Sequence, residues 1–284
     1  MGQRRVGPAR HLMSPALRPP PGSSPEESFA RVRRDLDHIR DVCRDEGSRN
    51  GYFAAMYSRV TAAVQVRAEA DRFNDARRME AFVARFARRY TDAYWAHAAG
   101  QPTSRAWALA FTTADAAGPL VVQHLGLGMN AHINLDLGVV AAEVAVGESG
   151  SATPGEPSAS LRADFMAIND VLFELVERCQ QAVVAASPLL GVADTLLAST
   201  DDDLARFSLT VARAGAWQFA RELTGSPPQE WATMIDARDR GVADLGGRLL
   251  TRAGPADDLR RLVRLGEWRG VTEVIDLLTA IDAA

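Results

Sequence analysis

The sequence lacks most features that would place a protein on a membrane or outside the cell. It has two cysteines, Cys43 and Cys179, among 284 residues, too few for a disulfide framework or a cysteine-rich metal site. It has no secretory hydrophobic segment, and outside residues 119–147 there is no uncharged apolar run of about 18 residues. That one stretch carries His and Asp, which argues against a membrane span. We therefore expect a cytoplasmic protein.

Strong positive charge is also absent. The chain has 32 basic and 36 acidic residues, a net charge of −4, so a general nucleic-acid-binding surface is not expected. The oligomeric state does not follow from the sequence. Residues 1–23 are rich in Pro, Gly and Arg, have no acidic residue and show no periodicity, which predicts a disordered leader. Residues 24–284 are long enough for one domain with a substantial core.

No convincing strand pattern occurs, whereas apolar residues recur at helical spacing along most of the chain. The spacing predicts an all-α fold, a multi-helix bundle of about ten helices around a buried central helix. Ser24 is the expected N-cap of the first helix, with Pro25 in its first turn. The expected helices cover residues 24–46, 52–70, 76–100, 105–117, 119–147, 161–186, 200–225, 228–250, 256–265 and 271–281.

The central helix is the stretch from Pro119 to Gly147, PLVVQHLGLGMNAHINLDLGVVAAEVAVG. Its apolar residues fall on every side of a helical wheel, which is typical of a helix covered all round by neighbours. Gly126, Gly128 and Gly138 each cost such a helix about 1 kcal/mol relative to alanine. We expect them to allow close approach by another helix or a ligand, with close packing the more common use.

Three polar residues of this helix form the candidate site. His124, His132 and Asp136 span an arc of roughly 120°, and His132 and Asp136 are one turn apart, so their side chains can meet. Imidazole and carboxylate are ligands for zinc or iron. His124 lies about 12 Å along the axis from His132, so it would need a second ion or a kink at Gly126 or Gly128. The alternatives are a buried hydrogen-bonded pair and acid–base work without a metal.

Two other helices supply further candidates. Asn169 and Asp170 lie beside the apolar stripe of helix 161–186 and are the best candidates to join the central site as catalytic residues. Arg213, on helix 200–225, lies beside another stripe and is placed to reach a carboxylate or an anionic ligand. The alternative is a surface carboxylate and a salt bridge on the rim.

Helix 76–100 has a basic face that either meets an anionic substrate or is simply solvated. Its members are Arg77, Arg78, Arg85, Arg88 and Arg89.

Five segments carry a resemblance to a known family: MYSRVT (56–61), SRAWALAF (104–111), QHLGLGMNAHINLDLG (123–138), DFMAINDVL (164–172) and ARAGAW (212–217). They resemble a family of uncharacterised actinobacterial proteins, a domain of unknown function, and the run GMNAHINLDL is the most specific part. The resemblance covers residues 50–225 and leaves 226–284 as a C-terminal helical flank. It implies a shared helical domain and no particular activity.

Three functions remain open. The first is a metal-dependent helical enzyme, for example a hydrolase, in which zinc or iron on His124, His132 and Asp136 activates a water molecule. The second is a non-catalytic helical module that binds an apolar small molecule or a protein partner. The third is an isomerase or cyclase that acts on an apolar substrate in an aromatic pocket. The rings expected to line that pocket are Trp107, Phe111, Phe165 and Trp217.

Overall fold

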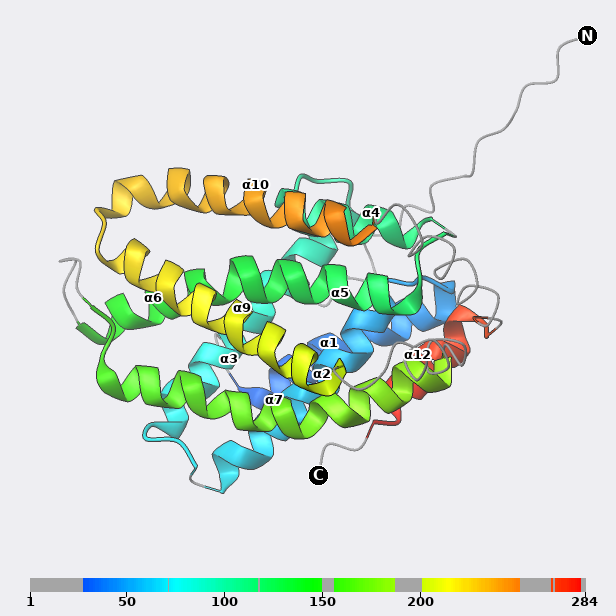
Figure 1. Ribbon diagram of the computed structural model, residues 1–284, viewed down its shortest axis with the longest axis horizontal. Helices are drawn as coiled ribbons and strands as arrows, with labels where there is room; N and C mark the ends of the chain where they lie inside the picture. The colour runs from blue at the N-terminus through cyan, green and yellow to red at the C-terminus, as the bar shows by residue number, and fades with distance from the viewer. Residues whose placement is uncertain are drawn as a thin grey trace, which may run out of the picture.

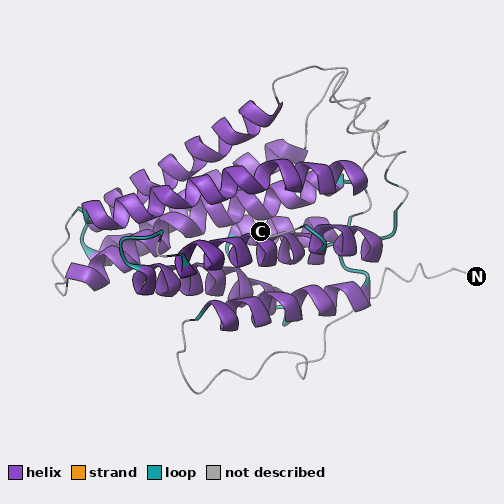
Figure 2. Cartoon of the chain, turned by 90° about the horizontal axis from the view of Figure 1, so that it is seen from below, coloured by secondary structure: helices purple, strands orange, loops and turns teal. Residues whose placement is uncertain are grey.

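The computed structural model describes residues 28–70, 72–116, 118–149, 156–186, 201–250, 267 and 269–281. These residues form an all-α bundle, and no strand occurs among them (Figures 1 and 2), which confirms the predicted fold class. The α-helices are α1 (Phe29–Glu46), α2 (Gly51–Glu69), α3 (Ala76–Ala98), α4 (Arg105–Ala114), α5 (Val121–Ala131), α6 (Leu137–Ser149), α7 (Ala159–Ala186), α9 (Asp201–Thr224), α10 (Trp231–Leu250) and α12 (Val271–Thr279). The predicted leader and the helix expected at 256–265 lie outside the described residues.

The first helix begins later than its sequence suggests. Its N-cap is Ser28, whose side chain accepts a hydrogen bond from the backbone N–H of Arg31 at 3.3 Å, and α1 starts at Phe29. The prediction of Ser24 as N-cap was therefore wrong, because Ser28 satisfies the free N–H group and has the extended backbone typical of an N-cap. The helix ends at Gly47, whose φ of 65° suits glycine.

Two apolar clusters make up the core. One is centred on α1, α2, α3, α4 and α5, with α12 packed against it. The other is centred on α6, α7 and α9. Phe86 on α3 contacts both clusters, so α3 lies where the two parts of the core meet.

The central stretch is divided into three helical pieces. Helix α5 leads into a π-helix, η2 (His132–Asp136), and α6 follows directly. Figure 1 shows α5 between α10 on one side and α7 on the other. The predicted regular α-helix was therefore wrong over one turn, and α5 begins two residues after Pro119, where the Gln123 side chain accepts from the Leu120 N–H at 2.9 Å.

Two of the three central glycines permit close packing, as expected. A Cβ at Gly128 would lie 2.5 Å from the Phe53 ring, and one at Gly138 would lie 2.7 Å from the backbone oxygen of Ala216 on α9. At Gly126 the nearest atom outside the helix is 3.9 Å away, on Leu249. The first two glycines therefore have a packing reason, and Gly126 does not.

The C-terminal flank is tied to the rest of the bundle through α4. Asp239 on α10 accepts hydrogen bonds from the backbone N–H groups of Arg105 and Ala106 at 2.7 and 3.0 Å. A carboxylate at a helix N-terminus satisfies free N–H groups and suits the helix dipole. This contact fixes the start of α4. None of the described helices has the length and apolarity needed to cross a membrane.

Candidate functional site: a buried His–Asp pair beneath a groove

The His132–Asp136 pair is held by the π-helix. His132 Nδ1 lies 3.4 Å from Asp136 Oδ2, and the two residues are only 3% and 1% exposed. A π-helical turn frees backbone groups that a regular α-helix would pair. Here Arg238 Nε of α10 donates to the carbonyl oxygen of Asn134 at 2.8 Å. The unusual turn is thus supported from outside by a neighbouring helix.

Both oxygens of the Asp136 carboxylate are occupied. Arg89 Nε donates to Oδ1 at 2.8 Å, and Trp107 Nε1 donates to Oδ2 at 2.8 Å. Burial by itself raises the pKa of Asp136, but the hydrogen bond from His132 and the charge of Arg89 outweigh burial and lower that pKa. Asp136 is therefore a buried, ionised carboxylate that anchors three neighbours.

His132 is neutral inside an aromatic cage. Its ring stacks on Phe86 with centroids 3.5 Å apart, and the Tyr57 ring meets it at 4.6 Å. Burial lowers the pKa of His132, although the bond to Asp136 opposes that shift. With the proton on Nδ1 facing Asp136, Nε2 carries a lone pair. Nε2 has no hydrogen-bond partner among the described residues.

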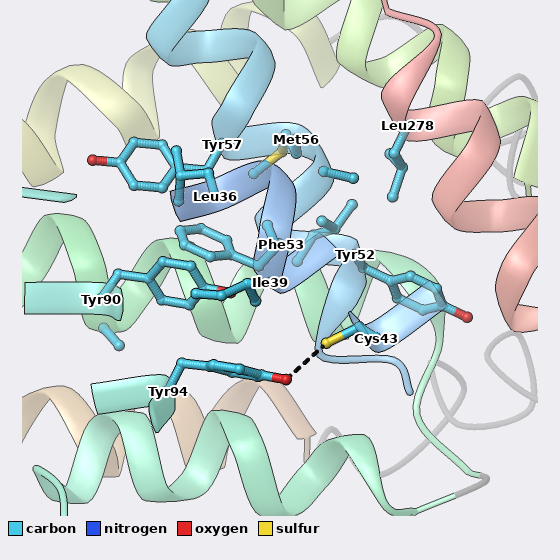
Figure 3. Packing of buried hydrophobic residues seen from close by; sticks show 14 of the residues in the cluster. Leu36, Ile39, Cys43, Tyr52, Phe53, Met56, Tyr57, Tyr90, Tyr94 and Leu278 are labelled. Atoms are coloured by element: carbon cyan, nitrogen blue, oxygen red, sulfur yellow. Dashed lines mark hydrogen bonds between the residues drawn. The ribbon is translucent and has the colours of Figure 1, made fainter. Parts of the chain in front are cut away.

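Two buried phenols lie in the same cage. Figure 3 shows Tyr57 and Tyr90 packed on either side of Phe53, with ring centroids 5.6 and 5.0 Å from it. Neither hydroxyl has a hydrogen-bond partner in the described part of the chain. Burial raises the pKa of both phenols, and the charge of Asp136 adds to this effect at Tyr57. Both are therefore neutral, and each keeps a hydroxyl proton available.

A groove of about 760 Å³ runs above the pair. The residues that line it come from α3, the 102–104 connection, α4, η2 and α6. Asp136 and Trp107 lie at its floor, since both are buried and still line it. One wall carries three arginines of α3: Arg85, Arg88 and Arg89. The groove therefore leads from a basic surface down to the buried carboxylate.

His124 does not complete a ligand set with the pair. Its buried ring meets the edge of Tyr52 at 5.9 Å. Within the described ranges no three His, Cys, Asp or Glu side chains lie close enough together to hold a metal ion. The structure thus brings together His132 and Asp136 of the predicted arc, but no third protein ligand.

The second set of candidates lies elsewhere, between α7 and α9. Arg213 donates to Asn169 Oδ1 and to the carbonyl oxygen of Phe165, and its guanidinium lies 4.5 Å from the centre of the Phe165 ring. Burial lowers the pKa of Arg213 to about 9. Asp170 is exposed and pairs with Arg67 at 3.1 Å. Among the described contacts, no hydrogen bond or ion pair connects these candidates with the His–Asp pair.

The four rings expected to enclose an apolar substrate are split into two pairs. Trp107 stacks on Phe111 at 5.2 Å in the first core cluster, and Phe165 packs on Trp217 at 4.9 Å in the second. Of the four, Trp107 alone lines the described groove. They do not form the common pocket that the third hypothesis requires.

The partners that define this site could not be identified from the sequence. Arg89 was predicted only as one member of a basic face, and Phe86 and Tyr57 were not among the candidates. Helical spacing shows which residues share a face, but not which face meets Asp136. One signal was available in the sequence. Arg89 follows Phe86 by three residues, so on a helix it lies on the same side as this apolar residue and next to the buried face.

One family model, described as a family of unknown function (DUF5995), matches residues 29–252. The match extends beyond residues 50–225 at both ends and includes α1 and α10. No curated protein and no solved structure gives a significant match.

Proposed function

The chain belongs to the DUF5995 family of unknown function, and we propose that its helical domain binds a small molecule in the groove between α3, α4 and α6. The observation that carries this proposal is the depth of the groove. Asp136 is 1% exposed and still lines the groove, so a ligand in the groove would lie directly above the buried carboxylate that binds Arg89, Trp107 and His132. Concave sites with a few converging polar groups are the usual places for small-molecule binding.

Filling the groove tests this function. Thr103 lines the groove from the connection before α4, so Thr103→Trp adds a large ring there without interrupting a helix. Ala163→Trp, at an exposed position on α7, is the matched control. Thermal-shift screening of a metabolite library should find compounds that stabilise the wild type and the control but not Thr103→Trp. Compounds that stabilise all three proteins equally would contradict binding in the groove.

Acid–base catalysis by His132 is a second candidate, favoured by its neutral ring and the unpartnered Nε2. A neutral imidazole oriented by a carboxylate can accept a proton from a substrate. The substrate must then reach Nε2, which lies within the aromatic cage. Mass-spectrometric mapping of diethyl pyrocarbonate adducts measures that access. Modification of His132 in the folded protein supports catalysis there, and complete protection argues against it.

Metal-dependent hydrolysis has weaker support. His132 and Asp136 could supply two ligands for zinc or iron, but the Asp136 carboxylate already takes part in three hydrogen bonds. Catalytic zinc sites use three protein ligands, and no third one lies close to this pair in the described part of the chain. A metal would have to displace Arg89 or Trp107 from Asp136.

A further inference from the structure

The groove is polarised along α3. Arg85, Arg88 and Arg89 line one end, and Ala93 and Ala96 follow along the same helix. At 1.5 Å per residue, Arg85 and Ala96 are about 16 Å apart along the axis. Pro102 and Thr103, which follow α3 in the chain, also line the groove. A ligand that fills the groove would therefore meet guanidinium groups at one end and small, mostly apolar side chains at the other.

The orientation of Arg89 is fixed from below. Asp136 accepts its Nε at 2.8 Å, and Glu143 of α6 lies 3.9 Å from its Nη1. The side chain is 32% exposed, so part of the guanidinium still faces the groove. A guanidinium has five N–H donors, more than these two acids use. The buried carboxylate thus holds a cation in place at the wall of the groove.

Arg88 is the neighbour that is available for a ligand. Its side chain is exposed, and no hydrogen bond or ion pair links it to another described residue. Two guanidinium groups on one wall of the groove, one held by Asp136 and one exposed, suit a carboxylate or phosphate group, which accepts paired N–H donors. Asp92 and Glu143 also line the groove. Glu143 lies beside Arg89, and Asp92 stands between the arginines and the two alanines in the sequence, so a ligand with a single anionic group is favoured over one with two.

On the basis of the proposed function, we propose that the ligand is a small organic anion. Its single carboxylate or phosphate group binds Arg88 and Arg89 near Arg85, and its short apolar body lies against Ala93 and Ala96. This deepens the proposed function by giving the chemical class of the ligand. It also assigns Asp136 a positioning role, since Asp136 acts on the ligand through Arg89.

Calorimetric titration of the full-length protein with three probes tests the ligand class. Benzoate and phenyl phosphate carry the anionic group, and benzamide is the neutral isostere of benzoate. Both anions should bind saturably, and benzamide should bind at least about tenfold more weakly, because each charge-assisted hydrogen bond contributes about 1.5–3 kcal/mol and 1.4 kcal/mol is tenfold. Arg88→Gln should weaken anion binding about tenfold.

The matched control is Arg77→Gln, an exposed arginine of the same helix that does not line the groove. It removes the same charge and should leave anion binding unchanged. Equal weakening in Arg77→Gln and Arg88→Gln would show a general charge effect and overturn the proposal. So would benzamide binding as tightly as benzoate, or no saturable anion binding up to about 10 mM, ten times a millimolar Kd.

The groove-filling variant separates this proposal from the more general one. If neutral library compounds bind the wild type and lose binding in Thr103→Trp while both anions fail to bind, the groove is a ligand site and the anionic class is wrong. If the anions bind and neither Thr103→Trp nor Arg88→Gln weakens them, they bind elsewhere and the anionic class is wrong, and binding in the groove fails as well if no library compound loses binding in Thr103→Trp. Loss of anion binding in both variants supports both.

Discussion

Replacing Gly138 by alanine should destabilise the protein, whereas the same change at Gly126 should not. Both glycines lie in the central stretch, and alanine gains about 1 kcal/mol of helix propensity at either one. At Gly138 the new Cβ would lie 2.7 Å from the Ala216 carbonyl oxygen and 3.0 Å from the Phe219 ring. Neither atom belongs to a flexible side chain end, so α9 must move, and overpacking of this kind costs about 1–3 kcal/mol.

The difference between the two variants isolates the packing cost, because the gain in propensity cancels. At Gly126 the new Cβ meets Leu249 at 3.9 Å, an ordinary contact. We therefore expect Gly138→Ala to be about 1–3 kcal/mol less stable to urea than Gly126→Ala, and Gly126→Ala to be at least as stable as the wild type. Equal unfolding midpoints for the two variants would refute the close approach of α9 to the π-helix region.

Three further predictions concern the buried polar groups. The pKa of His132 is lowered in the folded state, so as the pH falls the unfolded chain takes up this proton before the folded chain does. The free energy of unfolding should therefore fall as the pH drops below 6.5, by at most about 1.4 kcal/mol per pH unit. Urea unfolding measured at several pH values should show this slope in the wild type and not in His132→Gln. Tyr90→Phe should leave stability unchanged or raise it by about 1 kcal/mol, because the Tyr90 hydroxyl has no hydrogen-bond partner among the described residues. Tyr94→Phe should cost about 0.5–1.5 kcal/mol, because it loses the 3.2 Å contact with Cys43. A Tyr90→Phe variant that unfolds at a lower temperature than Tyr94→Phe would contradict these hydrogen-bonding states. Elemental mass spectrometry on protein purified without chelator should find no stoichiometric zinc or iron that His132→Ala removes, and finding such a metal would restore the metal-dependent hypothesis.

The helices could be predicted because their period is local. The apolar residues of α1 recur every three or four positions and are buried as expected, including Val32, Leu36 and Ile39. The start of α1 was missed because both Ser24 and Ser28 have the chemistry of an N-cap, and only the backbone decides between them. The π-helix was missed because His132 and Asp136 also fit one face of a regular helix.

Only the part of the site that lies on one helix could be predicted, again because helical spacing is local information. The pairing of His132 with Asp136 follows from their spacing on one helix. The partners that give the pair its properties, Arg89 and Trp107, come from two other helices, and a single sequence holds no information on which helices meet. The same holds for Arg213 and Asn169. Both were candidates and they contact each other, but their position away from Asp136 is set by tertiary packing, which the sequence pattern does not show.

The π-helix makes the length of the central stretch as important as its composition. One extra residue in the turn His132–Asp136 rotates everything downstream by roughly 100° relative to a regular helix. If the same residues wound as a regular α-helix, α6 would turn away from α9 and Asp136 would lose its alignment with Arg89. A single-residue deletion within this turn is compensated by a return to regular winding, whereas a deletion in α5 or α6, where the winding is already regular, rotates all that follows. Among natural variants of this chain, single-residue deletions should therefore occur in this turn before they occur in α5 or α6.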